Sequence, residues 1–550
     1  MRAWKGECGL REKLKTWESK DSEGWAMADT LRFVPPESII TGWDFSTGAV
    51  KCLAFDLSGQ VVAEVRLPTD LWRGEPYDER ISELNLMQLE GQARASVRAM
   101  VAALRDAGRL HHWIAGGISA THHTAGRIDK NRVQVRRAVC WNDQTLADYR
   151  RKGEERLGGS ARVRELIGGP WADRYSLSHL VKDEDPSYLS PEAWRRTWRI
   201  LPHGPLAAGY LTGNFDVISV SSAASTGIMD LRTCQWCREM LGALENQEYR
   251  ELAWKQLPRI IDMYEPIGRL AAHVCAEVGL VAEEAPWIFP TSDDQQAGLV
   301  GGGAVDAGQV AVILGNSAVV NSSSERLPSS DALDVMRLNW GPYLWMRCYN
   351  NGAQFLDSVV GENPDWSALQ AEARQLPPGS EGVQVMPFVQ SEPSLGIRGV
   401  VQPVWYPCRP EKVGTVFRAA LEAIAYLIRL GIEAHERAGQ QITRITVSGG
   451  IARSDLMCEI LASVLNRRLE RLVSAEGPAL GAAVTALAGV ETLLRRQHGV
   501  GEPFSVAGAV ATMVRYAASV NPNPEWVPIY EKEMQKFRER LEGYRASLGT

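Results

Sequence analysis

The sequence predicts an α/β protein of two domains that share a design. Its 550 residues are more than one hydrophobic core usually organises. Short apolar runs typical of strands alternate with helical periodicity along most of the chain. Each half opens on a hairpin whose turn is rich in glycine and in small polar side chains. We expect the two halves to meet within residues 286–303.

Composition excludes several classes of function. The chain has 60 basic and 66 acidic residues and a formal net charge of −6, which argues against a nucleic-acid-binding surface. No apolar run approaches the roughly 20 residues of a membrane span, so we expect no transmembrane helix. Cys234 and Cys237 form a C-x-x-C pair, but one such pair lacks the four ligands of a zinc site.

The first 37 residues are polar and show no periodicity, so we expect an extension and not a domain. They carry several charges and no apolar core of a secretion signal, which makes the cytoplasm the expected location. Met27 is an alternative start of the chain, because the first expected strand begins only at Ile39. We therefore expect residues 1–26 to be dispensable.

The elements of the first half follow from the apolar pattern. Strands are expected over residues 39–43, 50–55, 60–65 and 113–120. Between them, apolar side chains at spacings of three and four predict an amphipathic helix. These side chains are Leu89, Ala93, Val97, Val101 and Leu104.

The second half shows the same logic. Strands are expected over residues 309–314, 318–321 and 442–448. A long helix is expected from the apolar stripe of Val413, Phe417, Leu421, Ile424 and Ile428. Further helices are expected over residues 454–465 and 479–487, the last one just after a proline suited to a first helical turn.

The two hairpin turns contain groups that bind phosphate. In the first turn, Ser46 and Thr47 offer hydroxyls and Asp44 offers a carboxylate that can hold Mg²⁺. The second turn, residues 315–317, has the same small, polar character. Either turn alone fits an ordinary polar hairpin equally well. Together, in separate α/β halves, they predict a grip on one triphosphate.

An acidic pair lies in the segment between the halves. Phosphoryl transfer to an alcohol needs a carboxylate that accepts the hydroxyl proton. Asp293 and Asp294 are the candidates, and the alternative role is a cap on the helix that starts at Gln295. We expect Asp294 to be the base and Asp293 to be the cap.

With these motifs in place, the chain resembles the FGGY family of carbohydrate kinases in the actin/hexokinase-like superfamily, and most closely its xylulokinase branch. The matching residues of the nucleotide side are Gly42, Asp44, Thr47 and Lys51; Asp294, Ala297 and Gly298; Gly315 and Ser317; Gly449, Gly450, Arg453 and Ser454; and Glu476 with Ala479, Leu480, Gly481, Ala482 and Ala483.

Two segments also resemble the family's sugar pocket. They are Ser119 with His122, His123 and Asp129, and the run Trp141-Asn142-Asp143. A third segment over residues 201–213 is similar to a further family stretch. The resemblance covers residues 38–530 in the family's order. His122 stands where the family has an apolar residue, so we expect it to act behind the direct sugar contacts.

The resemblance implies two ribonuclease-H-like domains with an ATP and sugar cleft between them. The implied domains are a sugar-binding domain over residues 38–295 and a nucleotide-binding domain over 296–530. The extension over 1–37 precedes them, and a helical tail over 531–550 follows. A homodimer is left open.

The resemblance also implies the roles of the site residues. The cofactors are ATP and Mg²⁺, with Asp44 on the metal and Asp294 as the catalytic base. The implied sugar contacts are His123, Trp141, Asn142, Asp143 and Asp294. The implied ATP contacts are Ser46, Thr47, Lys51, Gly315, Asn316, Ser317, Gly449, Gly450 and Ser454.

Departures from the family pattern keep the substrate open. Ser46 and Asn316 replace a glycine and a threonine in the phosphate turns, and Ser292-Asp293 replaces two glycines before the base. Thr145 and Gly204 change the sugar side. The expected reaction is phosphorylation of a ketopentose such as d-xylulose. The alternatives are another ketose, a polyol or glycerol as substrate, or a non-catalytic protein that senses sugar or nucleotide.

Overall fold

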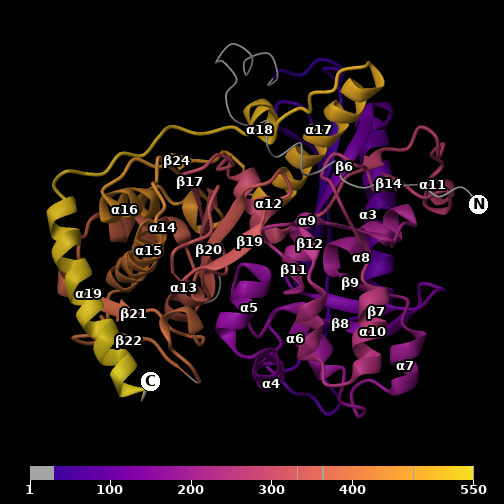
Figure 1. The fold of residues 1–550 in the computed structure, drawn as a ribbon. Coiled ribbons are helices and arrows are strands. Elements are labelled where there is room, and N and C mark those ends of the chain that lie inside the picture. The colour runs from indigo at the N-terminus through magenta and orange to yellow at the C-terminus, as the bar shows by residue number, and fades with distance from the viewer. Residues whose placement is uncertain (1–29, 331, 362–363, 400, 475, 549–550) are drawn as a thin grey trace, which may run out of the picture.

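The computed structural model of this protein describes residues 30–330, 332–361, 364–399, 401–474 and 476–548. Two central sheets lie side by side, each covered by helices (Figure 1). The sequence predicts an extension over residues 1–37, and residues 1–29 of it lie outside the described residues. The expectation that residues 1–26 are dispensable therefore also lies outside them.

The first sheet contains the strands predicted in the first half. Its order is β14-β15-β6-β1-β2-β3, and β16 also pairs with β6. The strands are β1 (Ile39–Phe45), β2 (Ala49–Phe55), β3 (Val61–Pro68), β6 (Trp113–Ala120), β14 (Gly268–Arg269), β15 (Trp287–Ile288) and β16 (Ser292–Asp293). Strands β1, β2 and β3 form the predicted antiparallel meander, while β6 runs parallel to β1.

The second sheet repeats this topology. Its order is β19-β20-β18-β17-β23-β24. The strands are β17 (Gln309–Leu314), β18 (Ala318–Ser324), β19 (Asp334–Arg337), β20 (Tyr343–Tyr349), β23 (Arg444–Ser448) and β24 (Glu470–Arg471). Strands β17, β18 and β20 form an antiparallel meander and β23 runs parallel to β17. The prediction of two α/β halves that each open on a hairpin is confirmed.

A smaller sheet lies beside the first one and was not predicted. Its order is β4-β5-β8-β7-β9. The strands are β4 (Leu71–Trp72), β5 (Glu83–Leu84), β7 (Ala125–Ile128), β8 (Gln134–Val139) and β9 (Arg199–Pro202). Three short pairs complete the described strands: β10 (Val217–Ser219) with β13 (Arg259–Ile261), β11 (Met229–Asp230) with β12 (Gln235–Trp236), and β21 (Gln384–Met386) with β22 (Val404–Tyr406).

The helices of the first half surround its sheets. They are α3 (Leu86–Asp106), α4 (Ala147–Leu157), α5 (Ser160–Ile167), α6 (Ser176–Lys182), α7 (Pro191–Arg196), α8 (His203–Thr212), α9 (Val220–Ala224), α10 (Gln247–Gln256), α11 (Ala272–Val278) and α12 (Asp294–Gly301). All five apolar side chains of the predicted stripe on α3 are buried, which confirms that helix.

The helices of the second half include the predicted long one. They are α13 (Ala353–Val360), α14 (Trp366–Arg374), α15 (Val413–Arg437), α16 (Asp455–Leu465), α17 (Gly477–Gln497), α18 (Val506–Met513) and α19 (Val527–Ser547). Helix α17 extends ten residues beyond the expected end at residue 487. By length and composition, this helix could cross a membrane, which corrects the expectation that no such apolar run exists. However, 83% of its most apolar 18-residue stretch is buried inside the fold.

Helices α12 and α17 pack directly on one another and hold the two halves together. Small residues allow this close approach. A Cβ on Gly481 would lie 1.8 Å from the carbonyl oxygen of Ala297, and one on Gly301 would lie 1.9 Å from that of Gly477. Although α17 follows the second sheet in the sequence, it packs on β1 and β6 of the first. The chain therefore returns to its first half after completing the second.

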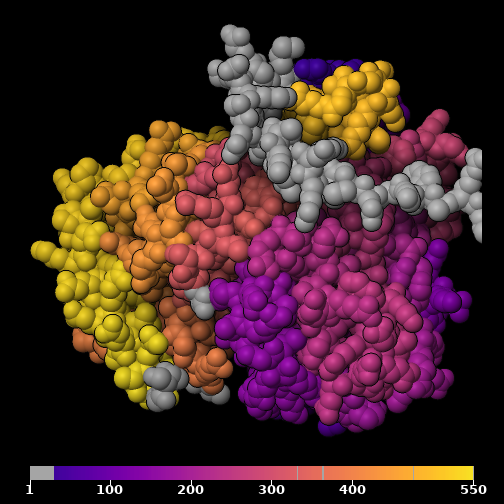
Figure 2. Space-filling model, in the orientation of Figure 1, coloured from indigo at the N-terminus to yellow at the C-terminus, as the bar shows by residue number. Residues whose placement is uncertain are grey.

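The described part of the N-terminal extension is attached to this returning helix. The backbone N–H groups of Arg32, Phe33 and Val34 donate to the Glu491 carboxylate at 2.9, 3.1 and 2.9 Å. Val34 is buried and the Phe33 ring stacks on His498. Figure 2 shows indigo N-terminal residues next to the gold segment that contains the end of α17. Residues 30–34 thus belong to the folded body, unlike the extension expected over all of 1–37.

Candidate active site

Parallel strands bring the acidic candidates to one edge of the first sheet. In the register of β1 and β6, Asp44 lies opposite Ser119, and in that of β16 and β6, Asp293 lies opposite Ala120. Because these strands are parallel, their carboxyl ends meet where α12 begins, and Asp294 is its first residue. The Ser119 hydroxyl donates to Asp44 Oδ1 at 3.1 Å. Two segments 250 residues apart therefore form one carboxylate centre.

Among the acids of this centre, Asp44 has the largest shift in pKa. Burial, followed by the nearby Asp294 carboxylate, raises the pKa of Asp44 to about 7. Lys51 and the Ser119 hydroxyl oppose that rise, and Glu476 adds to it. A bound cation would relieve the same repulsion. The donor set fits Mg²⁺, which commonly takes one or two protein carboxylates and completes its shell with phosphate and water.

Within the described ranges, no group of three or more histidine, cysteine, aspartate or glutamate side chains is arranged to hold a metal ion. A cation at Asp44 would therefore depend on oxygens from the nucleotide.

His122 lies between the two acidic residues of the interdomain segment. Its Nδ1 donates to Asp294 Oδ1 at 2.9 Å, and its Nε2 lies 3.3 Å from Asp293 Oδ2. The backbone N–H of Gln295 also donates to Asp294 Oδ1, at 2.8 Å. Burial disfavours the imidazolium form, but the two carboxylates outweigh it and raise the pKa of His122 above its ordinary value.

The expected capping role of Asp293 is wrong. Asp293 does occupy the residue before α12 with extended backbone, but its side chain makes no capping hydrogen bond. The carboxylate turns instead toward His122 and accepts from the Ser222 hydroxyl at 3.2 Å. Burial raises the pKa of Asp293 to about 6, while His122 opposes the rise. The sequence pattern could not reveal this, because His122 lies in the turn after β6 and Ser222 lies on α9, both far from Asp293 along the chain.

The expected sugar residue His123 is buried next to this centre. Its backbone has a φ of 62°, and its ring stacks on Tyr175 with centroids 4.4 Å apart. Nδ1 donates to the Ser225 carbonyl at 2.8 Å, and burial holds the pKa of His123 well below its usual range. The neutral ring therefore keeps Nε2 as an acceptor, and Nε2 has no hydrogen-bond partner among the described residues.

The Trp141-Asn142-Asp143 segment follows β8 in the smaller sheet. The Trp141 backbone N–H donates to the Thr124 hydroxyl at 3.3 Å, which places the segment beside the loop of His123. The indole is 38% exposed, so its face is available to a ligand.

The two polar residues after Trp141 already accept hydrogen bonds from other residues of the protein. Asn142 Oδ1 accepts from the Ser82 hydroxyl at 2.7 Å. Asp143 accepts from the backbone N–H groups of Ser82 and Thr145, both at 2.9 Å, and from the Thr145 hydroxyl. Through these hydrogen bonds, the two side chains hold the loop in place.

The two phosphate turns occupy equivalent positions in the two sheets. In the β1–β2 turn, the Ser46 hydroxyl donates to the Ala49 carbonyl at 2.8 Å, and Thr47 follows it. In the β17–β18 turn, Gly315 N–H donates to the Ser317 carbonyl at 3.0 Å, and the Asn316 carbonyl accepts from Gly352 N–H at 2.9 Å. Lys51 lies on β2 just after the first turn and pairs with Glu476.

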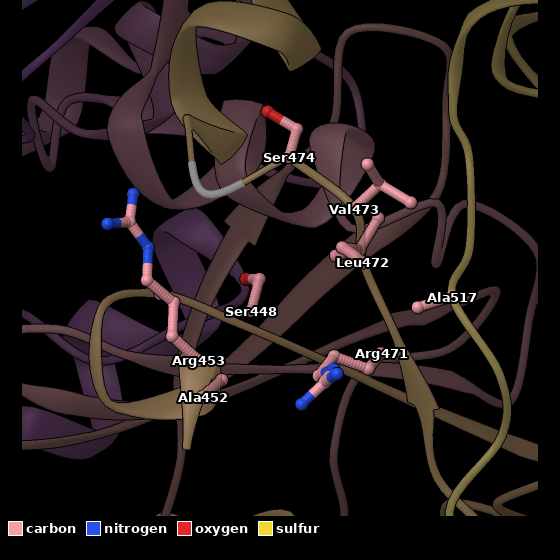
Figure 3. A pocket seen from close by; sticks show the side chains of 9 residues that line it. Ser448, Ala452, Arg453, Arg471, Leu472, Val473, Ser474 and Ala517 are labelled. Carbon is pink, nitrogen blue, oxygen red and sulfur yellow. The ribbon is translucent and has the colours of Figure 1, made fainter. Parts of the chain in front are cut away.

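A pocket of about 420 Å³ lies at the end of β23, next to the second turn (Figure 3). Its lining residues are Ser448, Gly449, Ala452, Arg453, Arg471, Leu472, Val473, Ser474 and Ala517. Of the ATP contacts predicted after β23, Gly449 lines the pocket, while Gly450 and Ser454 are not among the lining residues. The Ser454 hydroxyl caps α16 by accepting from the Met457 N–H at 3.2 Å. Arg471 and Ser474 come from outside any motif, and no pattern in the sequence indicated them.

Sequence reasoning also missed an ion pair between the two halves. Arg174 precedes α6 in the first half and pairs with Asp334 on β19 of the second sheet. Its charge opposes protonation of His122 and His123, so the guanidinium lies close to these two histidines. No motif contains Arg174, and only the fold brings it to this position.

Solved structures of sugar kinases share this architecture. Gluconate kinase from Lactobacillus acidophilus superimposes with a TM-score of 0.79 at 17% sequence identity, over 93% of this chain and 99% of that one. Xyloylose kinase from Brucella ovis superimposes with a TM-score of 0.76 at 22% sequence identity, over 92% of this chain and 99% of that one. These likenesses show the two-domain α/β fold that this chain shares with the solved sugar kinases.

The sequence narrows this class to one family. Residues 39–301 match the N-terminal domain and residues 397–490 match the C-terminal domain of the FGGY family of carbohydrate kinases. Xylulose kinase from Lactococcus lactis is 23% identical over 517 residues, which cover 91% of this chain and 96% of the relative. Xylulose kinase from Escherichia coli is 27% identical over 459 residues, which cover 80% of this chain and 88% of the relative. The chain belongs to the FGGY family of carbohydrate kinases.

Proposed function

We propose that this chain transfers the γ-phosphoryl group of ATP to a hydroxyl of a ketopentose, with d-xylulose as the first candidate. The observation that carries the proposal is the position of Asp294. Its Oδ1 accepts hydrogen bonds from His122 and Gln295, and its side chain is 29% exposed at the shared edge of the strands. One carboxylate oxygen is thus held and the other is left for a substrate hydroxyl.

In the proposed reaction, the hydroxyl oxygen forms a bond to the γ-phosphorus and the bond from that phosphorus to the β,γ-bridging oxygen breaks. Asp294 accepts the hydroxyl proton. Lys51 and the two turns hold the phosphates, and the pocket beside Gly449 receives adenosine. Asp44 would hold Mg²⁺ bound to the nucleotide, and the ion would neutralise charge on the phosphate oxygens.

The sugar would bind between His123 and Trp141. The Nε2 acceptor of His123 can take a sugar hydroxyl, and the exposed indole can cover a carbon–hydrogen face of the sugar. Asn142 and Asp143 stay proposed contacts, and they would need to exchange a loop hydrogen bond for a sugar hydroxyl. The ATP requirement makes the cytoplasm the proposed location.

ADP release measured across pentuloses, hexuloses, polyols and glycerol tests this proposal. The best substrate should be a ketopentose, its phosphate ester should be visible by ³¹P NMR, and release should stop in Asp294→Asn. ADP release that does not depend on any sugar, or a polyol as the best substrate, would contradict it.

A further inference from the structure

Two departures from the family pattern meet in the structure. His122 stands where the family resemblance calls for an apolar residue, and Asp293 stands where it calls for glycine. In the fold, His122 Nε2 lies 3.3 Å from Asp293 Oδ2, and both side chains are buried. This contact has the distance of an ion pair without the alignment of a hydrogen bond. The two unusual residues form a single unit beside Asp294.

This unit is connected to the proposed base. The other ring nitrogen of His122 donates to Asp294 Oδ1 at 2.9 Å. Asp293 is in turn fixed from behind, because its carboxylate accepts from the Ser222 hydroxyl at 3.2 Å and its backbone N–H donates to the Ser221 hydroxyl at 3.0 Å. The contacts therefore run from helix α9 through Asp293 and His122 to Asp294.

We propose that His122, held by Asp293, is a positioning residue that fixes Asp294 through Oδ1 and keeps Oδ2 directed at the acceptor hydroxyl. This inference rests on the proposed function, because it assigns Asp294 the role of base. A carboxylate tied at one oxygen loses rotational freedom, and proton acceptance depends on hydrogen-bond reach to the hydroxyl.

Charge explains why the unit needs both members. Asp293 and Asp294 are adjacent acids, and the Asp294 charge adds to the rise that burial causes in the pKa of Asp293. An imidazolium between them offsets that repulsion. Burial and the Arg174 charge oppose protonation of His122, yet the carboxylates prevail and the pKa of His122 is raised. The neighbouring His123 ring, with its centroid 5.0 Å away, is neutral. His122 without Asp293 would therefore be a weaker partner for Asp294.

A double-mutant cycle tests the inference with the best sugar from the substrate panel. His122→Met restores the apolar class of the family, and Asp293→Asn removes the charge but keeps an acceptor for Ser222. Each change should lower kcat roughly 10- to 100-fold, the range known for partners that orient a functional ligand. The KM for the sugar should change much less. The double variant should be no slower than the slower single variant, because both act through Asp294.

Two further variants separate positioning from mere structural support. His122→Gln keeps a donor toward Asp294 Oδ1 and should recover part of the kcat lost in His122→Met. His111→Met changes an exposed histidine and should leave kcat unchanged. Melting temperatures of all variants show whether the fold is intact.

The outcomes distinguish this inference from the proposed function. If the unmodified protein phosphorylates no sugar, the proposed function fails. If it is active and His122→Met or Asp293→Asn keeps the full kcat, the positioning role is overturned. Losses that multiply in the double variant, or that follow only the fraction of folded protein, overturn it as well.

Discussion

Lys51 Nζ lies 2.6 Å from Glu476 Oε2, and this ion pair joins β2 of the first sheet to the residue before α17. The lysine lies on β2 just after the first predicted phosphate turn, and the glutamate precedes the small-residue helix α17. Both side chains are about one quarter exposed, so the pair can open toward a ligand. The lysine also opposes the rise in the pKa of Asp44. The pair therefore sets the charge around the proposed metal ligand.

Asp294→Asn should lower kcat by roughly 10²–10⁴-fold, the usual contribution of a general base, because the amide cannot accept the hydroxyl proton. The change is isosteric, so ATP and sugar binding should remain close to normal. Steady-state kinetics with calorimetric ATP binding checks this. A variant with wild-type turnover would exclude Asp294 as the base.

Trp141→Ala should raise the KM for the sugar roughly 10-fold, since an aromatic contact contributes about 1 kcal/mol beyond its buried area and 1.4 kcal/mol corresponds to a factor of ten. Affinity for ATP should not change. Asp143→Ala is the contrasting variant, because it removes the acceptor for Ser82 and Thr145 and should lower the melting temperature. Weaker ATP binding in Trp141→Ala would contradict the prediction, because it would place the indole against the nucleotide and not against the sugar.

Gly449→Ala should destabilise the nucleotide side. Gly449 has a φ of +99°, and a Cβ there would lie 2.3 Å from the Leu314 carbonyl oxygen. The strain should cost at least about 1 kcal/mol and should raise the KM for ATP. Gly450→Ala is the matched control, because its backbone is helical and no heavy atom lies within 4 Å of the added Cβ. Equal behaviour of the two variants in melting and in ATP kinetics would refute the assignment.

Shortening the N-terminus in two steps should give two results. A chain beginning at Met27 keeps residues 32–34 and should melt like the full chain. A chain beginning at Glu37 leaves the buried Glu491 carboxylate without three N–H donors and should melt at a lower temperature, since an unsatisfied buried acceptor costs about 1–3 kcal/mol. Calorimetry on both chains is the measurement. A stable chain from Glu37 would show that the attachment adds nothing.

His435→Gln should make the protein less sensitive to acid. Burial lowers the pKa of His435 to about 3, from an ordinary value of 6.5. Below pH 6.5 the unfolded chain binds a proton that the folded chain rejects, so this histidine's contribution to stability is lost as pH falls from 6.5 toward 3. Between pH 7 and pH 5 the loss is about 2 kcal/mol, which the glutamine variant avoids. Denaturant unfolding at both pH values tests the difference; an equal loss in both proteins would rule it out.

Local pattern was enough to predict much of the fold. The apolar runs of β6 and β17 have the same bounds in the structure as in the sequence prediction, because a buried strand needs a continuous apolar run between turn residues. The helix of Leu89 and Leu104 was equally clear from its spacing. Shorter elements without such a pattern, such as the strands of the smaller sheet, were missed because pairing partners far along the chain define them.

The sequence by itself determined the family and the two-sheet design, since these depend on residue types in fixed local order. The prediction that Asp44 and Asp294 are the acids of the site has the same basis. Tertiary structure alone decided that His122 lies between two carboxylates, that Asp293 does not cap its helix, that Glu491 holds residues 32–34, and that Arg174 crosses to Asp334. Each of these contacts joins segments distant in the sequence. Their physical cause is the convergence of parallel strand ends and packed helices, which no local spacing encodes.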